Sequence, residues 1–178
     1  MELKNKKKVL LVIDMKNDFI DGALKNEEAM TIIENVNKKI ERYRENGDII
    51  IFTRDTHDTN YLNTIEGKYL PIQHCIKGTQ GWQISSKIKI NADDEIIDKP
   101  TFGSLDLANY VATLEPEEIE LIGVCTDICV ISNAMIMKAK FPEKEICVDA
   151  TCCAGVTPKS HKNAIEAMKM CHIKIKGE

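Results

Sequence analysis

The most regular feature of the chain is a series of short, unbroken apolar runs. Residues 8–14 contain the run Val-Leu-Leu-Val-Ile, and residues 48–53 contain Ile-Ile-Ile-Phe. Apolar side chains at consecutive positions are typical of strands that are covered on both faces, as in a parallel sheet. Shorter runs predict further strands at 95–97, 119–124 and 145–148, with a closing edge strand at 173–175.

Between these runs, apolar residues recur at helical spacing. The pattern is clearest in residues 27–46, and Gly47 follows as a C-cap. The periodic positions are Met30, Ile33, Val36, Ile40 and Tyr43. Further helices are predicted at 105–114, 128–140 and 158–171. Because strands and helices alternate, the chain is predicted to form a doubly wound α/β fold with right-handed crossovers.

One segment breaks this alternation. Residues 53–84 form a long connection that is rich in polar residues and glycine. Loops of this length in compact domains usually carry function. We therefore expect the connection to contribute to a site.

Length and composition favour one globular domain over residues 1–178. Of the 178 residues, 43% are hydrophobic and 29% are charged, as in an ordinary soluble protein. The net charge is −4 and only three residues are arginine, so nucleic acid is not an expected partner. No apolar run approaches the roughly 18 residues of a membrane span, so a cytoplasmic protein without membrane contact is expected. The seven cysteines are widely spaced and are expected to be free thiols.

Reactive residue types follow the predicted strands. Asp14 ends the first strand, Asp55 and His57 follow the second, Lys99 follows the third, and Cys129 follows the fourth. Ligands bind beyond the carboxyl ends of parallel strands, so these side chains are expected to meet at one edge of the sheet. An acid, an ammonium, a thiol and an imidazole in one place are suited to catalysis.

Cys129 is the strongest single candidate. With Thr126 or Asp127 as the N-cap, Cys129 would lie in the first turn of a helix, where unpaired N–H groups and the helix dipole favour a thiolate. We therefore expect a lowered pKa for Cys129, and the N–H groups of the same turn are suited to an oxyanion. The alternative is a small buried hydrophobic residue, as most free cysteines are.

Lys99 and Asp14 complete the catalytic candidates. Pro100 keeps Lys99 extended as the chain leaves its strand, and an ammonium there would favour a nearby thiolate. Asp14 ends an apolar run, and a partly buried carboxyl group at that place is suited to carrying protons. The alternatives are an exposed lysine and an aspartate that caps a turn.

The long connection and its flank also contain metal-ligand types. Asp55 and His57 are two residues apart, so in an extended segment both side chains leave the same face. Glu66 and His74 follow further along the chain. Two imidazoles with one or two carboxylates suit a divalent ion such as Zn, Mn or Fe. The alternative is that these are merely solvated loop residues.

Three stretches of sequence carry a family resemblance. Asp14 lies in Val-Ile-Asp-Met-Lys-Asn-Asp-Phe, Lys99 in Asp-Lys-Pro-Thr-Phe-Gly-Ser, and Cys129 in Gly-Val-Cys-Thr-Asp-Ile-Cys-Val. Together they resemble the isochorismatase-like cysteine hydrolases over about residues 8–158. Within that superfamily the chain is most similar to the nicotinamidases and pyrazinamidases, since the true isochorismatases lack a cysteine at the position of Cys129.

The resemblance implies a three-layer α/β/α sandwich with a mainly parallel sheet. It also implies a cysteine amidohydrolase that converts nicotinamide to nicotinate and ammonia through a thioester. In this pattern Asp14 carries protons, Lys99 supplies positive charge and Cys129 attacks the substrate. The resemblance also implies a non-proline cis peptide at Val124–Cys125, which would turn the N–H of Cys125 toward the oxyanion; the N–H of Cys129 is expected to bind the same oxyanion.

The resemblance further implies a divalent metal, zinc first and Mn or Fe as alternatives. The matching ligands are Asp55, His57 and His74, and some family members add a Glu at the position of Glu66. Phe19 matches the aromatic residue that packs on the pyridine ring of the substrate. Family members are often oligomers, so a homo-oligomer is expected.

The chain departs from the family pattern near the site. The family usually has Gln where Lys16 stands, and its proline lies two residues before the last metal histidine, whereas Pro71 lies three before His74. The sequence does not decide which of three aromatic residues forms the wall of the pocket, namely Tyr61, Tyr69 or Trp82.

Two other functions fit the same residues. A related hydrolase would use the same three catalytic residues on another small amide or on a ureido compound. A metal-binding or thiol redox-sensing protein is the alternative of another class, because Cys152 and Cys153 are adjacent and Cys125 lies near Cys129. Ammonia release from a panel of amides separates these possibilities.

Overall fold

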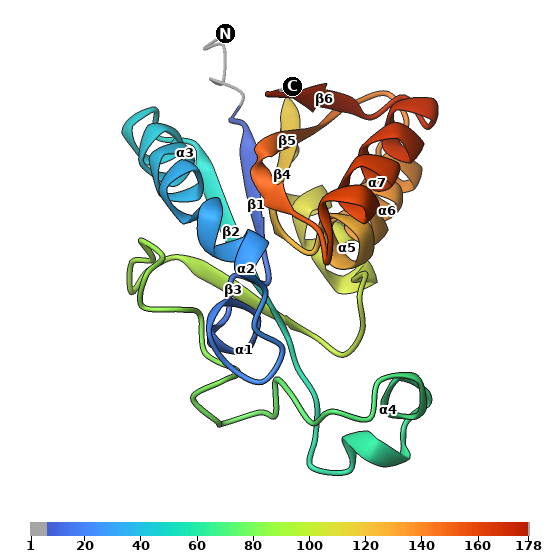
Figure 1. The fold of residues 1–178 in the computed structure, drawn as a ribbon. Helices are drawn as coiled ribbons and strands as arrows, with labels where there is room; N and C mark the ends of the chain where they lie inside the picture. The colour runs from blue at the N-terminus through green and yellow to red at the C-terminus, as the bar shows by residue number, and fades with distance from the viewer. Residues whose placement is uncertain (1–6, 178) are drawn as a thin grey trace, which may run out of the picture.

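The centre of the fold is a six-stranded sheet with the strand order β3-β2-β1-β4-β5-β6 (Figure 1). It is seen in a computed structural model that describes residues 7–177. All neighbouring strands pair in parallel. The strands are β1 (Val9–Ile13), β2 (Ile49–Asp55), β3 (Glu95–Lys99), β4 (Glu118–Val124), β5 (Glu145–Ala154) and β6 (Lys174–Lys176). The parallel sheet predicted from the apolar runs is thus confirmed.

Helices cover both faces of this sheet. The longer helices are α3 (Ile33–Glu45), α5 (Leu105–Thr113), α6 (Ile131–Lys140) and α7 (Pro158–Met170). Figure 1 shows α3 on one side of the sheet and α5, α6 and α7 on the other. This is the three-layer sandwich that the family resemblance implied.

The predicted helix over residues 27–46 is divided into two. The short helix α2 (Glu27–Thr31) is followed by Ile32, and α3 begins at Ile33. The side chain of Asn26 caps α2 by accepting a hydrogen bond from the N–H of Glu28. Gly47 follows α3 with a φ of +70°, and its N–H donates to the carbonyl of Arg44, as expected of a C-cap glycine.

The strand order reverses between β1 and β4, and the ends of these two strands lie side by side. Open parallel sheets bind ligands beyond the carboxyl ends of the strands at such a reversal. Gly123 allows the close contact, because a Cβ at this position would lie 2.1 Å from the carbonyl oxygen of Ile13. Gly123 also has a φ of +118°, which other residues rarely adopt. Asp14 after β1 and Cys129 after β4 are therefore placed at the same edge.

Strand β5 is longer than predicted. It runs over ten residues instead of the four at 145–148, and its register with β4 shifts between Leu121 and Gly123. The polar residues Asp149 and Thr151 end the apolar run, so the pattern gave no sign that the strand continues. The irregular pairing carries β5 past these residues.

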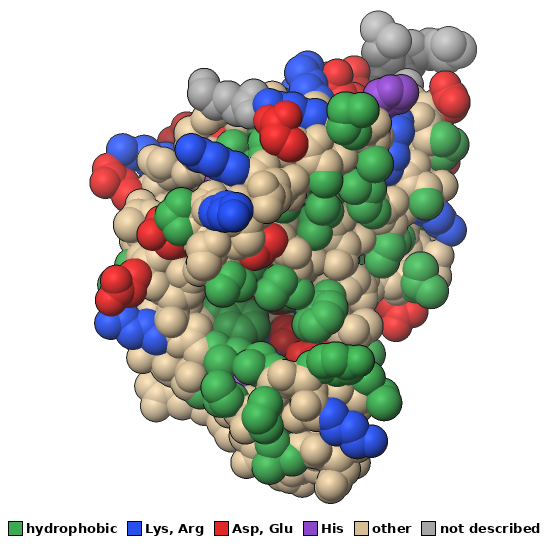
Figure 2. Space-filling view, turned by 45° about the vertical axis from the view of Figure 1, so that its right-hand side comes forward, with side chains coloured by type: hydrophobic (Ala, Val, Ile, Leu, Met, Phe, Trp, Pro, Cys, Tyr) green, Lys and Arg blue, Asp and Glu red, His purple; other side chains and the backbone are tan. Residues whose placement is uncertain are grey.

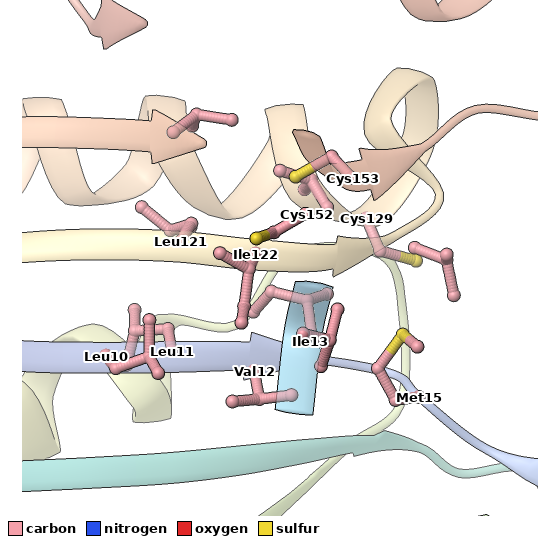
Figure 3. Packing of buried hydrophobic residues seen from close by; sticks show 14 of the residues in the cluster. Leu10, Leu11, Val12, Ile13, Met15, Leu121, Ile122, Cys129, Cys152 and Cys153 are labelled. Carbon is pink, nitrogen blue, oxygen red and sulfur yellow. The ribbon is translucent and has the colours of Figure 1, made fainter. Parts of the chain in front are cut away.

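The apolar core is built around β1, whose five residues have no exposed surface. Figure 3 shows side chains of β1 and β4 packed together, with Cys152 and Cys153 of β5 beside them. All seven cysteines are free thiols, as predicted. Within residues 7–177, no helix has both the length and the apolar character needed to cross a membrane.

The connection between β2 and β3, residues 56–94, forms a lobe beyond the carboxyl ends of the strands (Figure 1). It contains the 3-10 turn η1 (Tyr61–Asn63) and the short helix α4 (Ile65–Tyr69). Backbone bonding at Lys16 and Ile84 joins this lobe to the segment that follows β1, where the short helix α1 (Asn17–Ile20) begins. The long connection is thereby fixed against the edge that carries Asp14.

Candidate active site

Asp14 and Lys99 form a fully buried ion pair at the carboxyl edge of the sheet. The Nζ of Lys99 lies 2.6 Å from the Oδ2 of Asp14, and neither side chain is exposed. The hydroxyl of Thr53 donates to the Oδ1 of Asp14 at 2.8 Å, and the N–H of Asp55 donates to the same oxygen at 3.0 Å. The carboxylate is therefore held in one orientation by two neighbours on β2.

Lys99 remains an ammonium in this environment. Burial alone would lower its pKa, but the charges of the Asp14 and Asp55 carboxylates outweigh burial and raise it. The Nζ of Lys99 also donates to the carbonyl of Thr101 at 3.1 Å. A fixed positive charge thus lies against the carboxylate of Asp14 and also acts on the thiol of Cys129.

Cys129 lies in a π-helical turn, η2 (Thr126–Val130), directly after β4. Figure 3 shows its sulfur beyond the carboxyl end of β4. The side chain is buried, and the charged groups that act on it are those of Lys99, Asp14 and Asp55. Cys129, Lys99 and Asp14 are thus brought together from three strand ends.

The lowered pKa that we expected for Cys129 is wrong. Burial raises the pKa of the thiol well above its ordinary value, the Lys99 ammonium opposes this shift, and the carboxylates of Asp14 and Asp55 add to it. The predicted N-cap is also wrong, because the cap position is Cys125 and no side chain caps the turn. Cys129 therefore rests as a thiol and needs a base close by.

The turn that carries Cys129 is braced from two other elements. The Thr126 hydroxyl lies 2.8 Å from the Nδ1 of His161 on α7, and Asp127 accepts a hydrogen bond from the N–H of Val156 at 3.1 Å. Asn133 on α6 donates to the carbonyl of Cys129 at 2.8 Å. Of these supporting residues, only Thr126 and Asp127 were predicted from the sequence, and a capping role was expected for them.

The peptide bond between Val124 and Cys125 is cis, as the resemblance implied. The carbonyl of Cys125 accepts hydrogen bonds from the N–H groups of Ile128 and Val130, at 3.1 and 3.0 Å. These bonds close the turn around the position of Cys129. The assignment of the Cys125 and Cys129 N–H groups to an oxyanion stays a prediction.

The four predicted metal ligands converge beside this trio. One donor atom each from Asp55, His57, Glu66 and His74 lies within 4.8 Å of the others. The Nε2 of His57 lies 3.1 Å from the Oδ2 of Asp55 and 3.4 Å from the Oε1 of Glu66. The Nε2 of His74 lies 3.7 Å from the same two oxygens. The extra residue between Pro71 and His74 does not remove His74 from the cluster.

This donor set fits a divalent metal. Two imidazoles with two carboxylates are the ligand types that zinc, manganese and iron accept. The Oδ2 of Asp55 faces both histidines, whereas its Oδ1 is buried without a hydrogen-bond donor and lies 3.8 Å from the Nζ of Lys99. The Nδ1 of His74 contacts the carbonyl of Ile72 at 2.8 Å, an outer contact that directs Nε2 toward the cluster.

The neighbouring charges and burial shift the pKa values of His57, His74 and Asp55 in different directions. Burial would lower the pKa of His57, but hydrogen bonds to Asp55 and Glu66 outweigh burial and raise it to about 9. Burial lowers the pKa of His74. Burial would raise the pKa of Asp55, yet His57 and the nearby lysines lower it, so Asp55 stays ionised.

A cavity of about 760 Å³ adjoins the site, and Phe19, Leu70 and Cys125 line part of it. Figure 2 shows hydrophobic side chains around a hollow, with an acidic side chain inside it. Phe19, the predicted ring-packing residue, therefore borders both the cavity and the site, and its ring lies 5.9 Å from that of His74.

The three aromatic candidates for the pocket wall have different surroundings. Tyr61 is fully buried, and its ring lies 4.7 Å from that of His57 and 4.9 Å from that of His74. Trp82 is buried, donates to the hydroxyl of Thr56 and packs under Arg54. Tyr69 is 89% exposed. Tyr61 is thus the one of the three that supports the four-ligand cluster.

Comparison with known sequences identifies the family. Residues 8–176 match the isochorismatase domain. This chain belongs to the isochorismatase family. The three stretches around Asp14, Lys99 and Cys129 that carried the resemblance lie within the matched residues.

One relative in the isochorismatase family is PncA of Bacillus subtilis strain 168, described as an uncharacterized isochorismatase family protein. It is 32% identical over 142 residues, which cover 72% of this chain and 77% of PncA. The crystal structure of nicotinamidase/pyrazinamidase PncA from Bacillus subtilis matches with a TM-score of 0.84 and 27% identity, over 96% of this chain and 99% of that one.

Two further relatives bear on activity and metal. The pyrazinamidase of Pyrococcus horikoshii, crystallised in complex with zinc, matches with a TM-score of 0.86 and 28% identity over 97% of this chain and 99% of that one. A protein of Arabidopsis thaliana described as a probable inactive nicotinamidase is 31% identical over 183 residues, covering 93% of this chain and 89% of its own. Relatives at this level of identity thus include both a protein named as a pyrazinamidase and one described as probably inactive. The residues of the site must decide which of the two this chain resembles in activity.

Proposed function

We propose that this protein hydrolyses a small primary amide, nicotinamide first, to the carboxylic acid and ammonia through a thioester on Cys129. The observation that carries the proposal is the buried pair of Asp14 and Lys99, 2.6 Å apart, beside the Cys129 thiol. The amide-hydrolysing relatives named as nicotinamidase or pyrazinamidase support the substrate class.

The first half of the reaction forms the thioester. The sulfur of Cys129 attacks the amide carbon while its proton passes to the carboxylate of Asp14, which overcomes the raised pKa of the thiol. The N–H groups of Cys125 and Cys129 bind the oxyanion that develops on the amide oxygen. Asp14 then returns the proton to the nitrogen as the C–N bond breaks, so ammonia leaves and the acyl group stays on sulfur.

The second half removes the acyl group. Asp14 takes a proton from a water molecule, which attacks the thioester carbon, and the C–S bond breaks as the acid forms. The sulfur of Cys129 regains the proton, so the site returns to its starting state. Lys99 remains an ammonium throughout and stabilises negative charge on sulfur and on Asp14.

Asp55, His57, Glu66 and His74 are the residues that would hold a divalent metal. Such an ion would supply a Lewis acid for a ring nitrogen of the substrate, and this contact would orient the amide. Phe19 borders the cavity beside the cluster and is placed to cover one face of an aromatic ring. These features favour a heteroaromatic amide as the substrate.

The test is ammonia release from a panel of amides by metal-analysed protein. We expect nicotinamide and pyrazinamide to be hydrolysed with the highest kcat/KM. Their ring nitrogen suits the four-ligand cluster, and their primary amide suits the catalytic residues Asp14, Lys99 and Cys129. Benzamide, which lacks the ring nitrogen, serves as the matched control and is expected to be the poorer substrate. Hydrolysis of only aliphatic amides or ureido compounds would assign the site to the related-hydrolase alternative.

A further inference from the structure

Lys16 is a buried lysine that lies between the catalytic residue Asp14, two positions earlier in the chain, and the metal-ligand cluster, whose Asp55 it contacts. Its side chain has no exposed surface, although lysine is among the residues least often buried. Its Nζ donates to the backbone carbonyl of Asp55 at 2.7 Å and lies 4.5 Å from the centre of the Phe19 ring. Burial of an ammonium is costly, so a lysine at this position calls for an explanation.

The charge of Lys16 acts on a metal ligand. Its Nζ lies 3.9 Å from the Oδ2 of Asp55, the oxygen that faces His57 and His74. The Oδ1 of the same carboxylate lies 3.8 Å from the Nζ of Lys99. Asp55 is therefore shared between two ammonium groups. Among residues 7–177, Lys99 has a second carboxylate within ion-pair distance, that of Asp14, and Lys16 has none.

We propose that Lys16 is a positioning residue that limits the affinity of the four-ligand cluster for a divalent cation. Its hydrogen bond holds the backbone of Asp55, and its charge repels a cation bound to the Oδ2 of Asp55. The repulsion is strong because neither group is exposed to solvent that would screen it. The inference rests on the metal site of the proposed function.

A purely structural role for Lys16 predicts a different result. If the hydrogen bond to Asp55 were its whole contribution, loss of Lys16 would loosen Asp55 and weaken metal binding. If the charge dominates, loss of the charge strengthens metal binding. Lys16→Gln keeps a donor and removes the charge, and Lys16→Met removes both with a similar side-chain volume.

The experiment is a zinc titration of the full-length protein after chelator treatment, in competition with a chromophoric chelator at fixed pH. We expect Lys16→Gln and Lys16→Met to bind zinc about tenfold more tightly than the unmodified protein, since one nearby charge is removed. Lys38→Gln is the matched control, because it removes one positive charge from an exposed side chain on α3 and should leave the zinc affinity unchanged.

His57→Ala separates the two claims. If His57→Ala loses zinc but neither Lys16 variant binds zinc more tightly, the inference about Lys16 is wrong and the metal site stands. If His57→Ala binds zinc as the unmodified protein does, the metal site is wrong and the inference falls with it. Thermal melting of each variant confirms that a folded protein was titrated, and Lys16→Gln alone suffices if Lys16→Met does not fold.

Discussion

Replacement of Cys129 by alanine is expected to lower ammonia release at least about 1,000-fold, because the variant lacks the thiol that the Asp14 carboxylate and the Lys99 ammonium act on. The sulfur lies at the edge where Asp14 and Lys99 meet, so its loss leaves the base and the ammonium in place but removes the attacking atom. The measurement is the steady-state kcat with nicotinamide, together with the zinc content of the purified variant.

The control for this variant is Cys147→Ala. Cys147 is also fully buried, but it lies in β5 opposite Glu120 of β4, away from the carboxyl edge of the sheet. The Cys147→Ala variant should keep the turnover of the unmodified protein. This result would separate the effect of losing a buried thiol from the effect of losing the nucleophile. Turnover by Cys129→Ala within tenfold of the unmodified protein, at equal zinc content, would contradict the role given to Cys129.

Replacement of Glu120 by glutamine is expected to lower the free energy of unfolding by about 3 kcal/mol. The carboxylate of Glu120 is buried, lies 2.5 Å from the Nζ of Lys39 and 2.7 Å from that of Lys176, and accepts a hydrogen bond from Tyr43. The amide of glutamine leaves both lysines beside a neutral group. For a chain of this size the thermal midpoint should fall by roughly 6–12 °C.

The same network makes stability depend on pH. Burial would raise the pKa of Glu120, but Lys176 and Lys39 lower it in the folded state. Burial would likewise raise the pKa of Asp149, but Lys39 and Thr151 lower it. A carboxyl group whose pKa is lowered by folding stabilises the protein above its unfolded pKa, about 4, and loses that contribution as the pH falls through the folded value. The difference in the free energy of unfolding between the unmodified protein and Glu120→Gln should therefore become smaller as the pH falls below about 4.

A surface variant serves as the control for Glu120. Glu34 forms an ion pair with Lys38 one turn along α3, but both side chains are exposed to solvent. Glu34→Gln should unfold as the unmodified protein does, because solvent screens such a pair. Equal thermal midpoints for Glu120→Gln and Glu34→Gln would show that the buried network does not contribute to stability.

The sequence pattern predicts the sheet well where burial is complete on both faces. The apolar runs at 8–14 and 48–53 correspond to β1 and β2, because a strand between two helical layers must be apolar at every position. It fails at β5, where Asp149 and Thr151 lie inside the strand. Asp149 is accepted there because Lys39 lies 2.7 Å from it, a partner that the local pattern does not reveal.

The types of residue in the site were predictable, but their electrostatics were not. The grouping of Asp14, Lys99 and Cys129 was predicted from their positions after strand ends, since parallel strands end at one edge of the sheet. The pKa of Cys129 was predicted with the wrong sign because the helix-start argument took no account of complete burial. Supports such as Thr53 and Asn133 were missed, because hydroxyl and amide groups gain their role from neighbours distant in sequence.

The most direct test of the account is to trap the thioester. Nicotinamide is mixed with excess protein, the reaction is quenched in acid at successive times, and the peptide that carries Cys129 is examined by mass spectrometry. The account predicts a nicotinoyl adduct on Cys129 that rises and then decays as nicotinate appears. Nicotinate formed during that single turnover with no adduct on Cys129 at any quench time would contradict it.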